Sequence, residues 1–98
     1  MKAVFFIPSE NYSRAKNIVY EDDLVSRQSI NFREAKALGM KKEGYYLEVD
    51  GSGEAIRRLG EILKDIGEEV EKKEREEVLK RIAEQEESAA QGFGSIFG

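Results

Sequence analysis

The chain has 98 residues, with 16 basic and 20 acidic side chains, no cysteine and no histidine. Without cysteine it forms no disulfide and no thiolate nucleophile, and without histidine it lacks the commonest general base and transition-metal ligand. No remaining acid or tyrosine is paired by its spacing with a nucleophile or an oxyanion donor, so we predict no enzymatic activity, no metal site and no cofactor.

The first predicted strand covers residues 2–7, KAVFFI, and is apolar on both faces. Such a strand normally lies inside a sheet that is covered on both sides. We therefore expect one face to be covered by a helix of the domain and the other by the C-terminal helix or another subunit. Ser9 is the expected cap of a helix over residues 10–19, which ends before the acidic turn at 21–23.

A weaker strand is predicted at residues 24–30, LVSRQSI, where polar residues interrupt the apolar ones and favour an edge position. Asn31 and Glu34 then have the spacing of a reciprocal cap, which predicts a short helix over residues 32–38. Gly39 is expected to end that helix.

The clearest unit of the sequence lies between residues 43 and 67 and has the pattern of a strand, a glycine turn and a helix. Alternation places Tyr45 on the inward face of the strand with Leu47 and Val49, and Tyr46 on the outward face. Ser52 or Asp50 is the expected cap of the helix, whose apolar residues recur at three- and four-residue steps. Gly67 is expected to end it in a left-handed conformation.

Residues 68–91 contain a series of glutamates, each followed four residues later by a lysine or arginine. This spacing stabilises a solvated helix, so we predict a charged amphipathic helix here rather than a fourth strand at 68–72. Its sparse apolar patch, Val78, Leu79 and Ile82, should dock on the domain or on a second copy. Residues 92–98, GFGSIFG, are rich in Gly and Phe and predict a flexible tail.

The element order β-α-β-α-β-α predicts a small α/β (α+β) protein. We expect a two-layer sandwich with a ferredoxin-like or related order, followed by the charged helix and the tail. The predicted division is a compact domain at residues 1–67, the helix at 68–91 and the tail at 92–98.

The predicted function is a small protein-interaction or oligomerisation module. Large apolar side chains in a glycine-rich tail are typical of a docking peptide, because aromatic anchors dominate such contacts. We expect a homo-oligomer, most simply a dimer, or another protein partner. The expected contact residues are Phe93, Ile96 and Phe97 in the tail, and Val78, Leu79 and Ile82 in the helix.

The alternative is a small-ligand or RNA-binding module that uses a ferredoxin-like sheet. Its candidate residues are Arg27, Arg33, Lys41, Lys42 and Tyr46. Against RNA binding, residues 1–66 are neutral overall and the net charge of −4 lies in residues 67–98.

The apolar runs are too short for a membrane span or a signal peptide, which predicts a cytoplasmic protein. The abundance of Glu, Lys and Arg is compatible with a thermophilic source.

Overall fold

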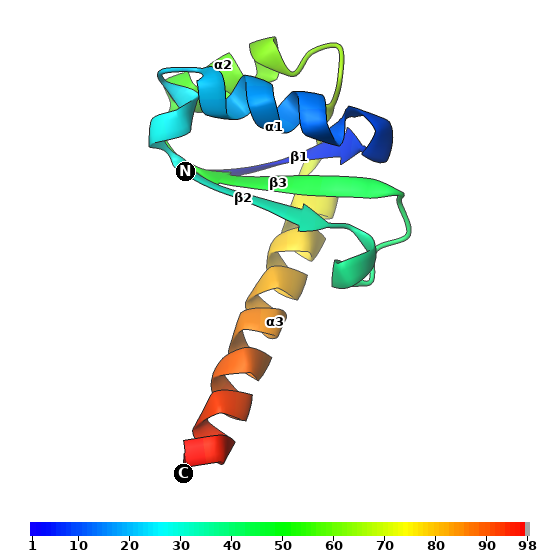
Figure 1. Ribbon diagram of the computed structural model, residues 1–98, viewed down its shortest axis with the longest axis vertical. Coiled ribbons are helices and arrows are strands. Elements are labelled where there is room, and N and C mark those ends of the chain that lie inside the picture. Colours follow the sequence, from blue (N-terminus) through cyan, green and yellow to red (C-terminus); the bar gives the residue numbers. More distant parts are fainter. Residues whose placement is uncertain (98) are drawn as a thin grey trace.

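The computed structural model describes the backbone of residues 1–97 and the side chains of residues 1–88. Within these residues the chain forms an α+β domain with one antiparallel sheet of order β2-β3-β1-β4 (Figure 1). The strands are β1 Lys2–Pro8, β2 Ser29–Glu34, β3 Gly44–Asp50 and β4 Glu68–Glu69. The helices are α1 Tyr12–Glu21, α2 Gly53–Ile62 and α3 Lys72–Phe97, and 3₁₀ turns lie at Ser9–Asn11, Val25–Arg27 and Lys36–Leu38.

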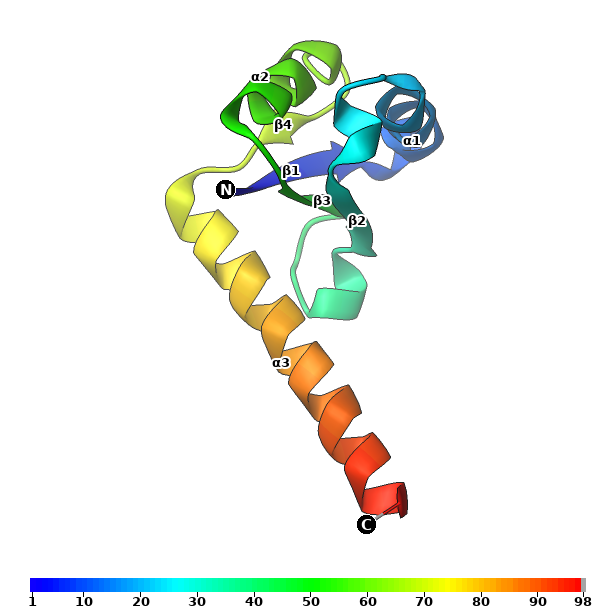
Figure 2. The ribbon, with the colours of Figure 1, turned by 90° about the vertical axis from the view of Figure 1, so that its left-hand side faces the viewer.

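Helices cover both faces of the sheet. Figure 2 shows α1 and α2 together on one side and α3 on the other. On the first side, Phe5 and Ile7 of β1 join Leu47 of β3 in a core with Val19 of α1 and Leu59 of α2. Side chains alternate in direction along a strand, so the residues next to Phe5, Ile7 and Leu47 in β1 and β3 point to the opposite face of the sheet.

The second face carries a smaller core beneath α3. Val4 of β1 and Tyr46 of β3 are fully buried there, together with Val78 and Ile82 of α3. The central position of β1 and its cover on both sides are therefore confirmed, and the C-terminal helix supplies the second cover. The prediction that Tyr46 faces outward was wrong, because strand alternation gives the side of a residue but not whether a later helix covers it.

The predictions for residues 24–38 were wrong in their boundaries. The strand lies at Ser29–Glu34, so Asn31 and Glu34 belong to β2 and do not cap a helix. The predicted helix at 32–38 is reduced to the 3₁₀ turn Lys36–Leu38, which Gly39 ends with a φ of 75°. Backbone pairing with β3 and the packing of Phe32 against Tyr12 override the local capping signal.

The prediction that residues 68–72 form part of a helix rather than a fourth strand was wrong for Glu68 and Glu69, which form β4. Glu68 and Glu69 pair with Phe6 and Phe5 of β1, and the N–H of Val70 donates to the carbonyl of Val4 at 3.0 Å. Both glutamate side chains are exposed, so their charges are compatible with a short edge strand. The charged helix consequently begins at Lys72 rather than at residue 68.

The capping predictions were partly confirmed. Ser52 caps α2, and its Oγ accepts from the N–H of Ala55 at 3.1 Å. Ser9 makes no capping bond, and α1 begins after Asn11.

Gly67 does not adopt the left-handed conformation that was predicted for it. A Cβ at Gly67 would lie 2.6 Å from Cδ1 of Ile7 and 2.8 Å from the carbonyl oxygen of Phe6, so the close approach of the chain to β1 requires glycine here.

Helix α3 is 26 residues long, and its contacts with the rest of the domain extend to Gln85 and Glu86. The C-terminal end of the helix projects away from the domain, which gives the molecule a longest dimension of 46 Å (Figures 1 and 2). The predicted tail at 92–98 falls beyond the residues whose side chains are described. Within the described residues, no helix has both the length and the apolarity that a membrane crossing requires.

Candidate functional site

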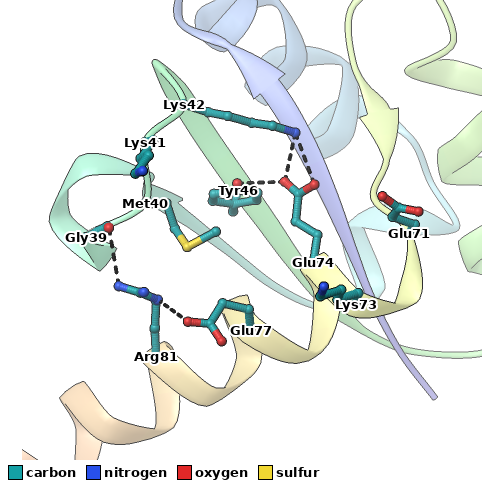
Figure 3. A pocket seen from close by; sticks show the side chains of 10 residues that line it. All are labelled: Gly39, Met40, Lys41, Lys42, Tyr46, Glu71, Lys73, Glu74, Glu77 and Arg81. Atoms are coloured by element: carbon teal, nitrogen blue, oxygen red, sulfur yellow. Dashed lines mark hydrogen bonds and ion pairs between the residues drawn. The ribbon is translucent and has the colours of Figure 1, made fainter.

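A pocket of about 530 Å³ lies where α3 crosses the sheet. One wall is the start of α3, the other is the segment that follows the 3₁₀ turn Lys36–Leu38, and Tyr46 of β3 lies between them (Figure 3). Seven charged residues of both signs line it: Lys41, Lys42, Lys73, Arg81, Glu71, Glu74 and Glu77.

The centre of the pocket is the carboxylate of Glu74. The hydroxyl of Tyr46 donates to its Oε2 at 2.7 Å, and Nζ of Lys42 donates to the same oxygen at 2.8 Å. Burial alone would raise the pKa of Glu74, but the bonds from Lys42 and Tyr46 outweigh it and hold that pKa below its ordinary value. Burial, and then the neighbouring carboxylate, raise the pKa of Tyr46, so its hydroxyl keeps its proton and acts as a donor.

Arg81 joins α3 to the 3₁₀ turn on the other wall. Its Nη1 donates to the carbonyls of Leu38 at 3.0 Å and Gly39 at 3.3 Å, and its Nε donates to Glu77 at 2.7 Å. The dashed bonds of Figure 3 run from Arg81 to both sides of the pocket. The guanidinium therefore satisfies two carbonyls at the end of the turn that accept no other hydrogen bond among the described residues.

The charges of this pocket largely compensate one another. Glu74 is paired with Lys42, and Glu77 is paired with Arg81. Among the residues whose side chains are described, no buried polar atom lacks a partner, and no group of acids is arranged to hold a metal ion. The geometry supports a structural role most directly, because Glu74 and Arg81 both bond to residues outside α3 and so hold the helix against the rest of the domain.

The residues predicted for nucleic-acid binding do not form one surface. Lys41, Lys42 and Tyr46 meet at the pocket, but Tyr46 is fully buried and has no free ring face for a base. Arg33 pairs with Glu86 at 3.1 Å. Arg27 precedes β2, at the other end of that strand from the pocket, and pairs with Asp23 at 3.4 Å.

The residues predicted for partner binding fall into two groups. Val78 and Ile82 are buried against the protein's own sheet, and Leu79 packs beside them at partial exposure. Of the two docking alternatives for this patch, the structure uses the domain itself. Phe93, Ile96 and Phe97 lie beyond the residues whose side chains are described.

An aromatic cluster at the β2 edge was not predicted as a site. Tyr12 stacks on Tyr45 with ring centroids 3.7 Å apart, and Phe32 lies 5.5 Å from Tyr12 and 6.2 Å from Tyr20. Tyr20 is 49% exposed, and the other three rings are partly exposed. We call these four residues the aromatic ledge. The eight-residue spacing of Tyr12 and Tyr20 in a helix was available as a signal, but the predicted helix at 32–38 hid the strand position of Phe32.

The acidic turn after α1 has a structural role. Oδ1 of Asp22 accepts from the N–H groups of Leu24 and Val25, and Oδ2 accepts from Nε of Arg58 on α2 at 2.8 Å. The bond from Val25 is the largest cause that lowers the pKa of Asp22, and Arg58 adds to it against the opposing effect of burial. Asp22 thus joins the end of α1 to α2.

Comparison with known proteins adds no identification: no family model matches the chain, and no curated protein and no solved structure matches it.

Proposed function

We propose that this protein is a small interaction module that associates with a second copy of itself through the projecting C-terminal end of α3, residues 88–97. The compact domain holds one end of the helix and presents the other. The strand order β2-β3-β1-β4, with α1 and α2 on one face, supports a ferredoxin-like two-layer unit to which α3 is added on the second face.

The observation that carries the proposal is the length of α3 beyond Gln85 and Glu86, which contact the domain. Nε2 of Gln85 donates to the carbonyl of Ala37 at 2.6 Å, and Glu86 pairs with Arg33. Beyond these contacts the helix continues to Phe97. At a rise of roughly 1.5 Å per residue, the helical backbone of residues 88–97 is about 15 Å long.

A projecting helix end needs a partner for its stability. Helical segments of this length are marginal in water when nothing packs against them. The sequence of this segment includes Phe93, Ile96 and Phe97, which are unusual residues for a solvated helix end. A second copy offers the same apolar residues, so that two ends can bury one another.

A ligand or RNA on the sheet has less support. Helices cover both faces of the sheet, and the one predicted stacking residue, Tyr46, lies beneath α3. The described basic residues near it are mostly paired with acids.

The test is the solution mass of the full chain and of a chain that ends at Ser88, measured by light scattering across concentration. We expect the truncation to lower the mass and to leave the urea midpoint of the domain unchanged, because Val78 and Ile82 remain in place. If the full chain and the truncated chain are both folded and have the same solution mass, the proposal is contradicted.

A further inference from the structure

Strand β2 has a free edge. It pairs with β3 on one side, and among the described residues no backbone hydrogen bond joins Ser29–Glu34 to any other element. The opposite edge of the sheet, β4, is only two residues long and carries two glutamates. Short, charged edges resist pairing with other chains, whereas a six-residue edge without proline is a template for it.

The direction of the free backbone groups follows from the β3 ladder. The N–H of Ala35 donates to the carbonyl of Gly44 at 2.9 Å, so residue 35 belongs to a hydrogen-bonded pair with β3. Because such pairs alternate along an antiparallel ladder, the N–H and C=O groups of Ile30, Phe32 and Glu34 point away from β3. The free edge therefore presents three evenly spaced donor and acceptor sets.

The aromatic ledge lies beside this edge on the α1 side. Phe32 comes from β2 itself, Tyr45 from β3, and Tyr12 and Tyr20 from α1. All four are incompletely buried in the single chain. Partly exposed aromatic side chains next to unpaired backbone groups combine the two contributions that strand addition uses, apolar burial and main-chain hydrogen bonds.

The β2 sequence is complementary to itself in one antiparallel register. Residues that lie directly opposite must share a face, and Ile30 and Phe32 both pack on the α1 and α2 side. A two-fold axis through Asn31 places Ile30 opposite Phe32 of the second copy. The same axis places Ser29 opposite Arg33, and Gln28 opposite Glu34, so that no like charges meet.

The neighbouring register is worse. An axis through Phe32 would place Ile30 opposite Glu34 of the second copy, which sets an apolar residue against a charge. In the register through Asn31, the outward groups of Ile30 and Phe32 exchange hydrogen bonds between copies.

We propose that a second copy of this chain adds its β2 to this β2, antiparallel about Asn31, and so forms one continuous sheet across two copies. This inference rests on the proposed self-association but places a contact at a different surface from α3. Helix α1 of each copy then lies on the same side of the joint sheet, and the two aromatic ledges face one another.

Charge variants at Asn31 test the register, because the axis sets this residue opposite itself. Asn31 is exposed in the single chain and lies opposite Glu48 of β3, so urea unfolding of each variant separates an effect on the fold from an effect on association. We expect Asn31→Lys and Asn31→Asp each to weaken association of the full chain by roughly threefold to tenfold at low salt. An equimolar mixture of the two variants should regain the wild-type mass, because Lys and Asp then oppose each other across the axis.

Asp65→Asn is the matched control, because it changes the net charge by one unit on an exposed residue of the segment between α2 and β4, outside β2. Its mass should equal that of the wild type, and circular dichroism should show the same fold for all variants. The inference is overturned if both Asn31 variants keep the wild-type solution mass. It is also overturned if the variants lose mass and their equimolar mixture does not regain the wild-type mass. A wild-type chain that stays monomeric also overturns it and leaves the edge to an extended peptide of another protein.

The truncation at Ser88 separates the two proposals. If truncation lowers the mass and the Asn31 variants do not, the α3 contact stands and the β2 contact fails. If the Asn31 variants lower the mass and truncation does not, the β2 contact stands and the α3 contact fails.

Discussion

The hydroxyl of Tyr46 is the polar end of an otherwise apolar contact between β3 and α3. Its ring packs edge-on to Phe6 with centroids 5.4 Å apart, while its oxygen donates to Glu74. One residue thus contributes both to the core beneath α3 and to the bonds that fix the helix direction. Hydrogen bonds to a charged partner contribute more to stability than neutral ones.

We predict that Tyr46→Phe lowers the free energy of unfolding by about 1 to 3 kcal/mol, because the ring stays but the bond to the Glu74 carboxylate is lost. Tyr45→Phe is the control on the same strand, since its hydroxyl has no hydrogen bond among the described residues. Urea unfolding followed by circular dichroism measures both. A Tyr46→Phe variant as stable as Tyr45→Phe would show that the Glu74 bond contributes nothing.

At the scale of elements, two glycines with different surroundings are predicted to respond oppositely to alanine. Gly60 lies in α2, and a Cβ at this position would meet no atom of another element within 4 Å, so Gly60→Ala should stabilise by about 0.5 to 1 kcal/mol through helix propensity. Gly67→Ala should destabilise by about 1 to 3 kcal/mol, because its Cβ would collide with β1. Thermal unfolding of the pair checks both, and equal shifts in the same direction would contradict the packing account.

The elements that the sequence predicted correctly carry their own local signals. β1 and β3 combine β-branched and aromatic residues with clear turn residues at their ends, and α2 has a regular apolar stripe. The Ser52 cap follows from the same local chemistry. In these stretches, propensity and burial favour the same structure.

The remaining elements depend on contacts with distant residues. β2 forms because Phe32 packs on α1 and its backbone pairs with β3, although Asn31 and Glu34 suit a helix start. β4 has only two residues and no pattern of its own. For the candidate sites, Lys42 and Tyr46 could be named from the sequence, but their meeting with Glu74 depends on the path of α3 over the sheet.

At the scale of the whole molecule, two depressed carboxyl groups join distant segments and should make stability depend on pH. The pKa values of Glu74 and Asp22 lie below their ordinary values of 4.5 and 3.8. Each group therefore stabilises the fold fully above its ordinary pKa and loses that contribution as the pH falls through the lowered value. Their partners, Lys42 and Arg58, lie on other elements.

We predict that the free energy of unfolding declines as the pH drops below about 4.5, and that Glu74→Gln makes this decline shallower. The control is Glu84→Gln, an exposed acid of the same helix without a partner among the described residues. Urea titrations between neutral and acidic pH provide the measurement. A Glu74→Gln variant with an unchanged pH slope would assign the acid sensitivity to other groups.

The central position of β1 sets the order in which a nascent chain can fold. Phe5 precedes both of its partners in the chain, since it pairs with Leu47 on one side and with Glu69 on the other. Closing such long loops costs chain entropy before any contact rewards it. During synthesis β1 must wait, with one side open, until Glu69 has left the ribosome, and only then can α3 close over Tyr46. The sheet of this chain is therefore completed only after residue 69 has been made, and a chaperone that shields β1 would act before that point.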